Sequence, residues 1–129
     1  MVKVIPPRLV EPYLAGQRSV IAGYVYRASD CSFRTPADYY QALALGYDGS
    51  EFSAGMAELF VLRWIALDMS ASLVAGPRAS GSPVSVIPEF FTLPVPIPVG
   101  AEMGRVTFGG EEFIGRYDGQ AWLRPLREA

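Results

Sequence analysis

Apolar residues dominate the stretch from Ala54 to Ala75, AGMAELFVLRWIALDMSASLVA, which lies within the longest run of the chain without a proline, residues 37–76. Its alanines and leucines are strong helix formers, and the Gly-Pro pair that follows is a typical helix stop. Its charged residues, Glu58, Arg63 and Asp68, recur every five positions, so a helix would carry them on different sides. We therefore predict a mostly apolar helix that is buried on several sides.

Residues 58–67 also fit a strand that is buried on both faces, and the sequence leaves the choice between helix and strand open. The two faces of such a strand would carry Phe60, Leu62 and Trp64, and Val61 and Ile65. A membrane-spanning helix is disfavoured, because Arg63 and Asp68 would each cost about 2.5 to 3.5 kcal/mol near the bilayer centre, whereas a large apolar residue gains about 0.3 to 0.6 kcal/mol.

The N-terminal part of the chain predicts two strands separated by an extended segment. Met1 to Ile5 alternates as a short strand does, and the prolines that follow at positions 6, 7 and 12 favour extended backbone. We therefore expect residues 1–18 to form an extended arm. Ser19 to Arg27 alternates between two faces, as a strand does, and Ala28 to Phe33 then forms a loop.

A short helix is predicted after Thr35. The hydroxyl of Thr35 can cap the helix, Pro36 suits its first position, and the carboxylate of Asp38 can reach back to the cap. The apolar residues that follow indicate that the helix runs through Leu45 and ends at Gly46.

Prolines and glycines recur through residues 77–100, which we interpret as a linker followed by a proline-rich extended segment. The prolines at positions 94, 96 and 98 lack the N–H groups that a central strand donates, so the segment fits a sheet edge or a polyproline arm. Its aliphatic side chains would then be free to contact another chain. The predicted interface residues are Leu93, Val95, Ile97 and Val99, together with Trp64 from the central stretch.

Residues 103–125 predict an antiparallel β-meander with turns at Gly109-Gly110 and Asp118-Gly119. Two-residue turns at these positions would pair Val106 with Phe113 and Trp122 with Gly115. We expect Phe113 and Trp122 to share a buried face, with the indole covering the bare backbone of the glycine.

The composition indicates one small α+β domain of 129 residues with an apolar excess. Half of the residues are hydrophobic, 19% are charged, and the formal net charge is −2. Excess apolar surface favours contact with other protein chains. The arginines do not cluster, so we expect no nucleic-acid partner. Too few apolar residues precede Pro6 for a signal peptide. Cys31 is the single cysteine, and we expect it to be a small buried residue.

Few residues suggest catalysis. The chain has no histidine, which removes the usual triads, imidazole bases and zinc sites, and we expect no cofactor or metal. Arg27 at a strand end, with the acidic pair Glu111 and Glu112, resembles in outline the Arg and Glu elements of ADP-ribosyltransferase and NAD-glycohydrolase toxins. That resemblance implies dinucleotide binding by the arginine and support of an oxocarbenium-like step by a glutamate. The Ser-Thr-Ser strand and the Glu-x-Glu spacing of that family are missing here.

The first function hypothesis is a non-catalytic structural or assembly protein, acting as a homo-oligomer or as a repeated component of a larger particle such as a phage virion. It follows from the apolar central stretch, the proline-rich segments and the scarcity of catalytic residues. Self-association or other protein subunits are the expected partners, with no membrane partner, and the location would be the virion. The alternative is the small NAD-consuming toxin, which would be cytoplasmic.

Overall fold

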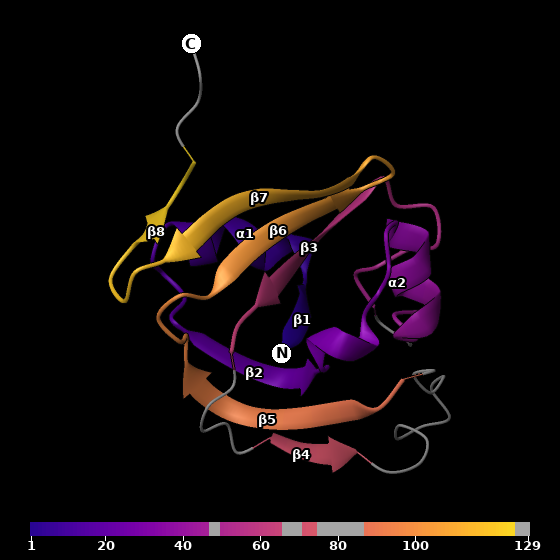
Figure 1. Cartoon of the computed structure of the whole chain (residues 1–129), viewed down its shortest axis with the longest axis horizontal. Helices are drawn as coiled ribbons and strands as arrows, with labels where there is room; N and C mark the ends of the chain where they lie inside the picture. The colour runs from indigo at the N-terminus through magenta and orange to yellow at the C-terminus, as the bar shows by residue number, and fades with distance from the viewer. Residues whose placement is uncertain (47–49, 66–70, 75–86, 126–129) are drawn as a thin grey trace.

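The computed structural model is an α+β fold in which strands predominate (Figure 1), as the sequence predicted. The structure describes residues 1–46, 50–65, 71–74 and 87–125, and only the backbone of 71–74. The strands are β1 (Val2–Ile5), β2 (Val20–Val25), β3 (Glu58–Arg63), β4 (Ala71–Val74), β5 (Glu89–Pro96), β6 (Glu102–Thr107), β7 (Gly110–Tyr117) and β8 (Trp122–Leu123). The helical elements are α1 (Pro7–Leu14), the 3-10 turn η1 (Ala28–Asp30) and α2 (Pro36–Ala42).

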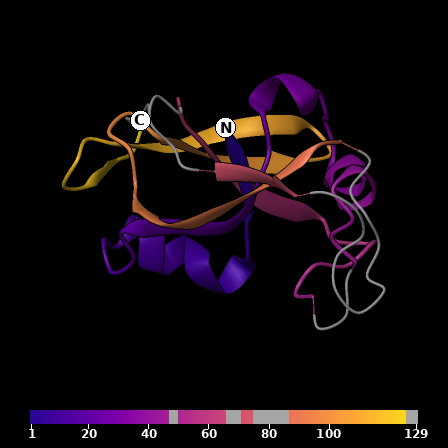
Figure 2. The same cartoon turned by 90° about the horizontal axis from the view of Figure 1, so that it is seen from below.

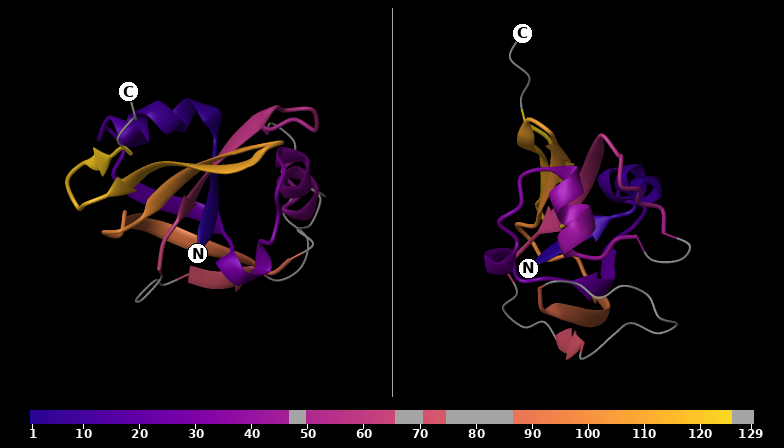
Figure 3. Two further views of the ribbon diagram at one scale, coloured as in Figure 1. Left: turned by 45° about the horizontal axis from the view of Figure 1, so that its top comes forward. Right: turned by 90° about the vertical axis from the view of Figure 1, so that its right-hand side faces the viewer.

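Two antiparallel sheets form the body of the molecule. One has the strand order β1-β3-β6-β7-β8 and the other the order β2-β5-β4. A single bridge, Val2 with Tyr26, joins β1 to the end of β2 through two backbone hydrogen bonds of 2.7 and 2.8 Å. Beyond this bridge no further pairs between β1 and β2 occur in the described residues. Figure 2 shows α1 below β2, whereas Figure 1 and Figure 3 show α2 at one end of the molecule, near the β6–β7 turn.

The central apolar stretch is a strand where the structure describes it, so the favoured helix prediction is wrong for residues 58–63. β3 pairs with β1 on one edge and with β6 on the other, and both of its faces are covered. Leu59 and Val61 pack in one core cluster with α2, and Leu62 packs in a second cluster with α1 and β2. These contacts outweigh the helical preference of the local composition. Residues 66–70 and 75 lie outside the described residues.

The N-terminal segment forms the predicted strand β1, but the extended conformation predicted after it is wrong. Pro7 occupies the first turn of α1, where its missing N–H would have no helical partner, and Pro12 removes only one bond of this short helix. Val10 and Tyr13, three residues apart, share the face that is buried against β2 and β3. Burial of this face outweighs the extended preference of the prolines.

The capped helix is confirmed at its start and corrected at its end. The Thr35 hydroxyl accepts a hydrogen bond from the N–H of Asp38 at 3.2 Å, and the Asp38 carboxylate accepts one from the N–H of Thr35 at 3.3 Å. This reciprocal pair is a capping box. The helix ends at Ala42 rather than near Gly46, because Ala44 takes a positive φ of 52° that breaks the helical path.

The proline-rich segment does form a strand in the middle of a sheet, contrary to the prediction. β5 pairs with β4 through residues 89–92 and with β2 through residues 90–96. Leu93 and Pro94 together lie opposite Ala22, which is a β-bulge, and the prolines at 94 and 96 lie beyond the part that pairs with β4. Pro94 therefore lies in a β-bulge, one of the positions where sheets tolerate proline.

The C-terminal meander is confirmed with a different register. The β6–β7 turn is Phe108-Gly109, so Gly104 pairs with Phe113, and Trp122 pairs with Tyr117. Phe113 is 41% exposed, so its predicted burial is wrong. The burial of Trp122 is confirmed, and its ring still lies 3.7 Å from where a Cβ on Gly115 would be.

Candidate functional site

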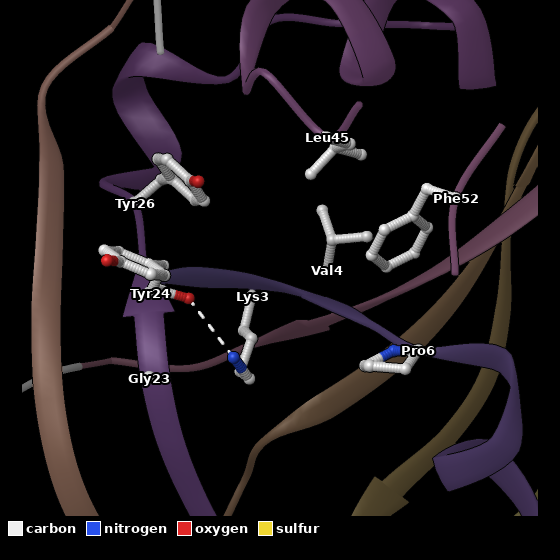
Figure 4. A pocket seen from close by; sticks show the side chains of 8 residues that line it. All are labelled: Lys3, Val4, Pro6, Gly23, Tyr24, Tyr26, Leu45 and Phe52. Atoms are coloured by element: carbon white, nitrogen blue, oxygen red, sulfur yellow. Dashed lines mark hydrogen bonds between the residues drawn. The ribbon is translucent and has the colours of Figure 1, made fainter. Parts of the chain in front are cut away.

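A pocket of about 150 Å³ lies between β1 and β2, where these strands diverge beyond the Val2–Tyr26 bridge. Its walls come from β1, β2 and the segment after α2 (Figure 4). The lining residues are Lys3, Val4, Pro6, Gly23, Tyr24, Tyr26, Leu45 and Phe52. Most of this surface is apolar, and the Lys3 ammonium is the cationic group that lines it.

The Lys3 side chain is directed at the backbone of β2. Its Nζ donates a hydrogen bond to the carbonyl oxygen of Tyr24 at 3.3 Å, drawn as a dashed line in Figure 4. Gly23 leaves room for the amine, since a Cβ at that position would stand 3.3 Å from Nζ, and its φ of +93° favours glycine as well. On the opposite side Val4, Leu45 and Phe52 gather into an apolar wall (Figure 4).

The electrostatic environment of Lys3 opposes its positive charge. Burial, and to a lesser extent the nearby positive charge of Arg18, lower the pKa of Lys3 to about 8. Within the described part of the chain no carboxylate forms an ion pair with Lys3. Another lining residue, Tyr26, has an acidic partner, because its hydroxyl donates to the buried carboxylate of Glu89 at 2.6 Å. The pocket therefore holds an unpaired cation.

We predict that Lys3→Met raises the free energy of unfolding at pH 7 by on the order of 1 kcal/mol, since water at the pocket mouth screens part of the charge. The lowered pKa means that the unfolded chain binds more protons than the folded chain between about pH 8 and the ordinary lysine value. The contribution of Lys3 to wild-type stability should therefore rise with pH in that window, and the advantage of the variant should disappear there.

Urea denaturation at pH 7 and pH 9.5 measures this difference. Arg8→Met is the matched control, because Arg8 is an exposed cation outside the pocket, paired with Glu51. The control should change stability by less than about 0.5 kcal/mol at either pH. A Lys3→Met protein that is less stable than wild type at pH 7 would contradict the prediction.

An exposed apolar strip on β2 and β5 adjoins the pocket. We define the β2–β5 strip as Tyr24, Phe91 and Leu93, whose exposed fractions are 37%, 42% and 66%. Tyr24 and Phe91 are cross-strand partners whose rings meet edge to face with centroids 5.5 Å apart. Leu93 follows Phe91 by two residues on the same strand, and Tyr24 also lines the pocket. Pocket and strip thus form one continuous candidate site.

The predicted interface residues divide into two groups. Leu93 and Val99 are exposed, and Val99 lies against the turn at Gly119. Ile97 and Trp64 are corrections, because both are buried in the core cluster of their own chain with α1 and β2, and Val95 is half-buried against the same cluster. The sequence missed Tyr24, Phe91 and Lys3. The available signal for Lys3 was that the only lysine of the chain stands between two valines of a strand.

The residues of the toxin-like alternative are engaged separately. Arg27 forms an ion pair with Asp30 at 2.9 Å and lies over the Phe90 ring, whereas Glu111 binds Arg63. Glu112 is exposed near Arg105, at 3.8 Å. The described contacts thus bring neither glutamate to Arg27, and nothing in this arrangement favours dinucleotide chemistry.

A polar network that the sequence did not predict connects β3, β7 and α2. Arg63 donates to both carboxylate oxygens of Glu111, at 3.0 and 2.8 Å, and to the Tyr39 hydroxyl at 2.8 Å. Glu111 reaches β3 across Gly104, where a Cβ would stand 2.9 Å from its carboxylate. Burial raises the pKa of Tyr39 to about 12, although the Arg63 charge acts in the opposite direction. We interpret the network as structural, because it ties the helix to the sheet.

Cys31 is a free and buried cysteine, as predicted, and burial raises the pKa of its thiol to about 11.

No helix in the described ranges is long and apolar enough to cross a membrane. No protein-family model, curated protein or solved structure matches the chain.

Proposed function

We propose that this protein is a non-catalytic assembly protein, which acts as a homo-oligomer or as a repeated component of a larger particle such as a phage virion. The observation that carries the proposal is the β2–β5 strip, where three large apolar side chains lie together on the outer face of a sheet. Burying such a side chain in a contact is worth about 1.5 to 3 kcal/mol. Contiguous apolar surface of this kind is typical of protein–protein contacts.

A second copy of the chain is the partner that the strip fits best. Its three side chains carry no charge, so two copies of the strip can face each other across a two-fold axis without like-charge repulsion. The edge-to-face contact of Tyr24 with Phe91 already fixes both rings in the free chain, which reduces the entropy lost on association.

Side-chain burial rather than strand addition should hold this contact. The edge of β5 that continues past β4 contains Pro94 and Pro96, which cannot donate hydrogen bonds to an added strand. Leu93, on the same stretch, can still insert between the side chains of a partner. We also propose the virion as the location of the protein, where its partners would be further copies or other subunits of the particle.

The test is the mass of a double variant, Phe91→Thr with Leu93→Ser, measured by size-exclusion chromatography with light scattering. We expect wild type to be oligomeric and the variant to be monomeric, with an unchanged far-UV circular dichroism spectrum, since neither side chain is buried in its own core. The matched control is Phe108→Thr with Leu123→Ser, which also replaces one exposed phenylalanine and one exposed leucine and should stay oligomeric. A monomeric wild type, or equal masses for both variants, would refute the proposal.

A further inference from the structure

We propose that the pocket between β1 and β2 binds one carboxylate carried on a compact apolar body the size of a benzene ring, with the Lys3 ammonium pairing with the carboxylate. The inference is independent of the assembly proposal. It rests on the size of the pocket, on the chemistry of its walls, and on the absence of an acidic partner for Lys3 within the described part of the chain.

The size and the walls of the pocket determine the body of the ligand. A volume of about 150 Å³ equals that of an engineered cavity, in another protein, that binds benzene. The side chains of Val4, Leu45 and Phe52 form one wall, and the ring of Pro6 closes the side next to α1 (Figure 4). Such walls favour an aromatic or branched aliphatic group, and they leave no room for a nucleotide.

The charge of the pocket determines which charged group the ligand carries. Lys3 bears a partly desolvated positive charge, and Arg18 is close enough to repel it. Arg18 itself is directed at Tyr13, to whose hydroxyl its Nε donates at 3.1 Å, so it does not fill the pocket. An anion that enters would relieve this repulsion, and binding would thereby favour the protonated amine.

A carboxylate is a better partner for the Lys3 ammonium in this pocket than a phosphate is. Phosphate sites in proteins converge several donors, such as backbone N–H groups or arginine forks, on three or four oxygens. Here a single ammonium faces apolar walls and already shares one hydrogen bond with the Tyr24 carbonyl. One carboxylate oxygen can accept a hydrogen bond from an ammonium N–H that does not bind the Tyr24 carbonyl.

Benzoate is the probe, titrated into the wild-type protein and followed through the amide NMR signals of Gly23 and Tyr24. We expect saturable shifts with benzoate and at least tenfold weaker binding of benzamide, which has the same shape without the charge. Lys3→Met should weaken benzoate binding at least tenfold, whereas Arg8→Met, outside the pocket, should leave it unchanged. The benzoate–benzamide comparison uses wild type alone, so it decides the matter even if Lys3→Met fails to fold.

The pH dependence adds an independent readout. Benzoate stays ionised above pH 6, whereas Lys3 lines the pocket and loses its charge between pH 7 and 9. The Arg18 guanidinium, the Tyr24 and Tyr26 hydroxyls and Glu89 complete the polar surroundings of Lys3. Benzoate affinity should fall about tenfold from pH 7 to pH 9. Equal binding of benzoate and benzamide, or affinity that is independent of Lys3 and of pH, would overturn the proposal.

The source of the carboxylate is tested in the same titration. A tripeptide ending in a free phenylalanine carboxylate represents a protein chain terminus, and its C-terminally amidated form is its control. Tighter binding of benzoate identifies a small free acid as the ligand class, whereas tighter binding of the tripeptide identifies the end of a polypeptide. If neither compound with a free carboxylate binds more tightly than its neutral counterpart, the carboxylate site is refuted.

Discussion

Replacing Trp122 by alanine should lower the free energy of unfolding by about 3 to 5 kcal/mol. The indole is only 8% exposed, packs at 5.4 Å between ring centroids against Tyr117, and covers Gly115. β8 has just two residues and pairs with β7 alone, so few backbone bonds would compensate for the lost side chain. Alanine would leave a cavity that the short strand cannot close without abandoning its pairing.

Urea denaturation at a fixed protein concentration measures this loss, because association would otherwise shift the midpoint. Leu123→Ala is the matched control: the neighbouring residue of the same strand is exposed and should cost less than about 1 kcal/mol. A loss below about 1 kcal/mol for Trp122→Ala would mean that β8 does not belong to the folded core.

Tyr39→Ala should cost a similar amount, about 3 to 5 kcal/mol. Tyr39 has no solvent exposure, its ring meets Phe33 edge to face at 5.1 Å, and its hydroxyl accepts a hydrogen bond from Arg63. The substitution removes the ring with which α2 packs in the core cluster that also holds Leu59 and Val61 of β3. It also leaves the Arg63 guanidinium with Glu111 as its remaining partner in the network.

Tyr39→Phe separates the two contributions. It keeps the ring and removes only the hydroxyl, so it should cost about 1 to 2 kcal/mol. Thermal and urea unfolding of the two variants beside wild type provide the comparison. Equal losses for the phenylalanine and alanine variants would assign the stabilisation to the hydrogen bond instead of to the packed ring.

The sequence predicted the structure correctly where a segment's conformation depends on its own residues. The cap at Thr35 and the alternation in β2 were predicted correctly, since a capping box and an alternating strand depend on residues within one segment. The C-terminal turns also placed β6, β7 and β8 in order. Their register was missed, because the β6–β7 turn falls at Phe108-Gly109 instead of Gly109-Gly110, and because residues 118–121 rather than a two-residue turn separate Tyr117 from Trp122.

The errors arose where contacts between distant segments determine the result. β3 has a helix-forming composition, but β1 and β6 supply hydrogen bonds on both of its edges. The segment after β1 looked extended because of its prolines, whereas burial of Val10 and Tyr13 makes it the helix α1. β5 was expected at an edge, but its residues 89–92 pair with β4 on one side and its residues 90–96 pair with β2 on the other.

The candidate site was only partly predictable for the same reason. Aliphatic residues that alternate with prolines suggested an exposed segment, and Leu93 and Val99 are exposed, but that pattern could not show that Ile97 is buried. The partners of Leu93 in the strip come from pairing β2 with β5, which are separated by more than sixty residues in the sequence. The Lys3 pocket likewise needs the divergence of β1 and β2, and no local pattern predicts it.

The most direct test of assembly through the β2–β5 strip is the reactivity of a cysteine introduced at Leu93 toward a maleimide. The only native cysteine, Cys31, is buried with a raised thiol pKa, so the new thiol should react selectively. At a concentration where light scattering shows the oligomer, we predict that the Leu93→Cys thiol reacts at least tenfold more slowly than in dilute monomer. Leu123→Cys, exposed on β8, should react at the same rate in both states. A Leu93→Cys thiol that reacts equally fast in oligomer and monomer would contradict assembly through this strip.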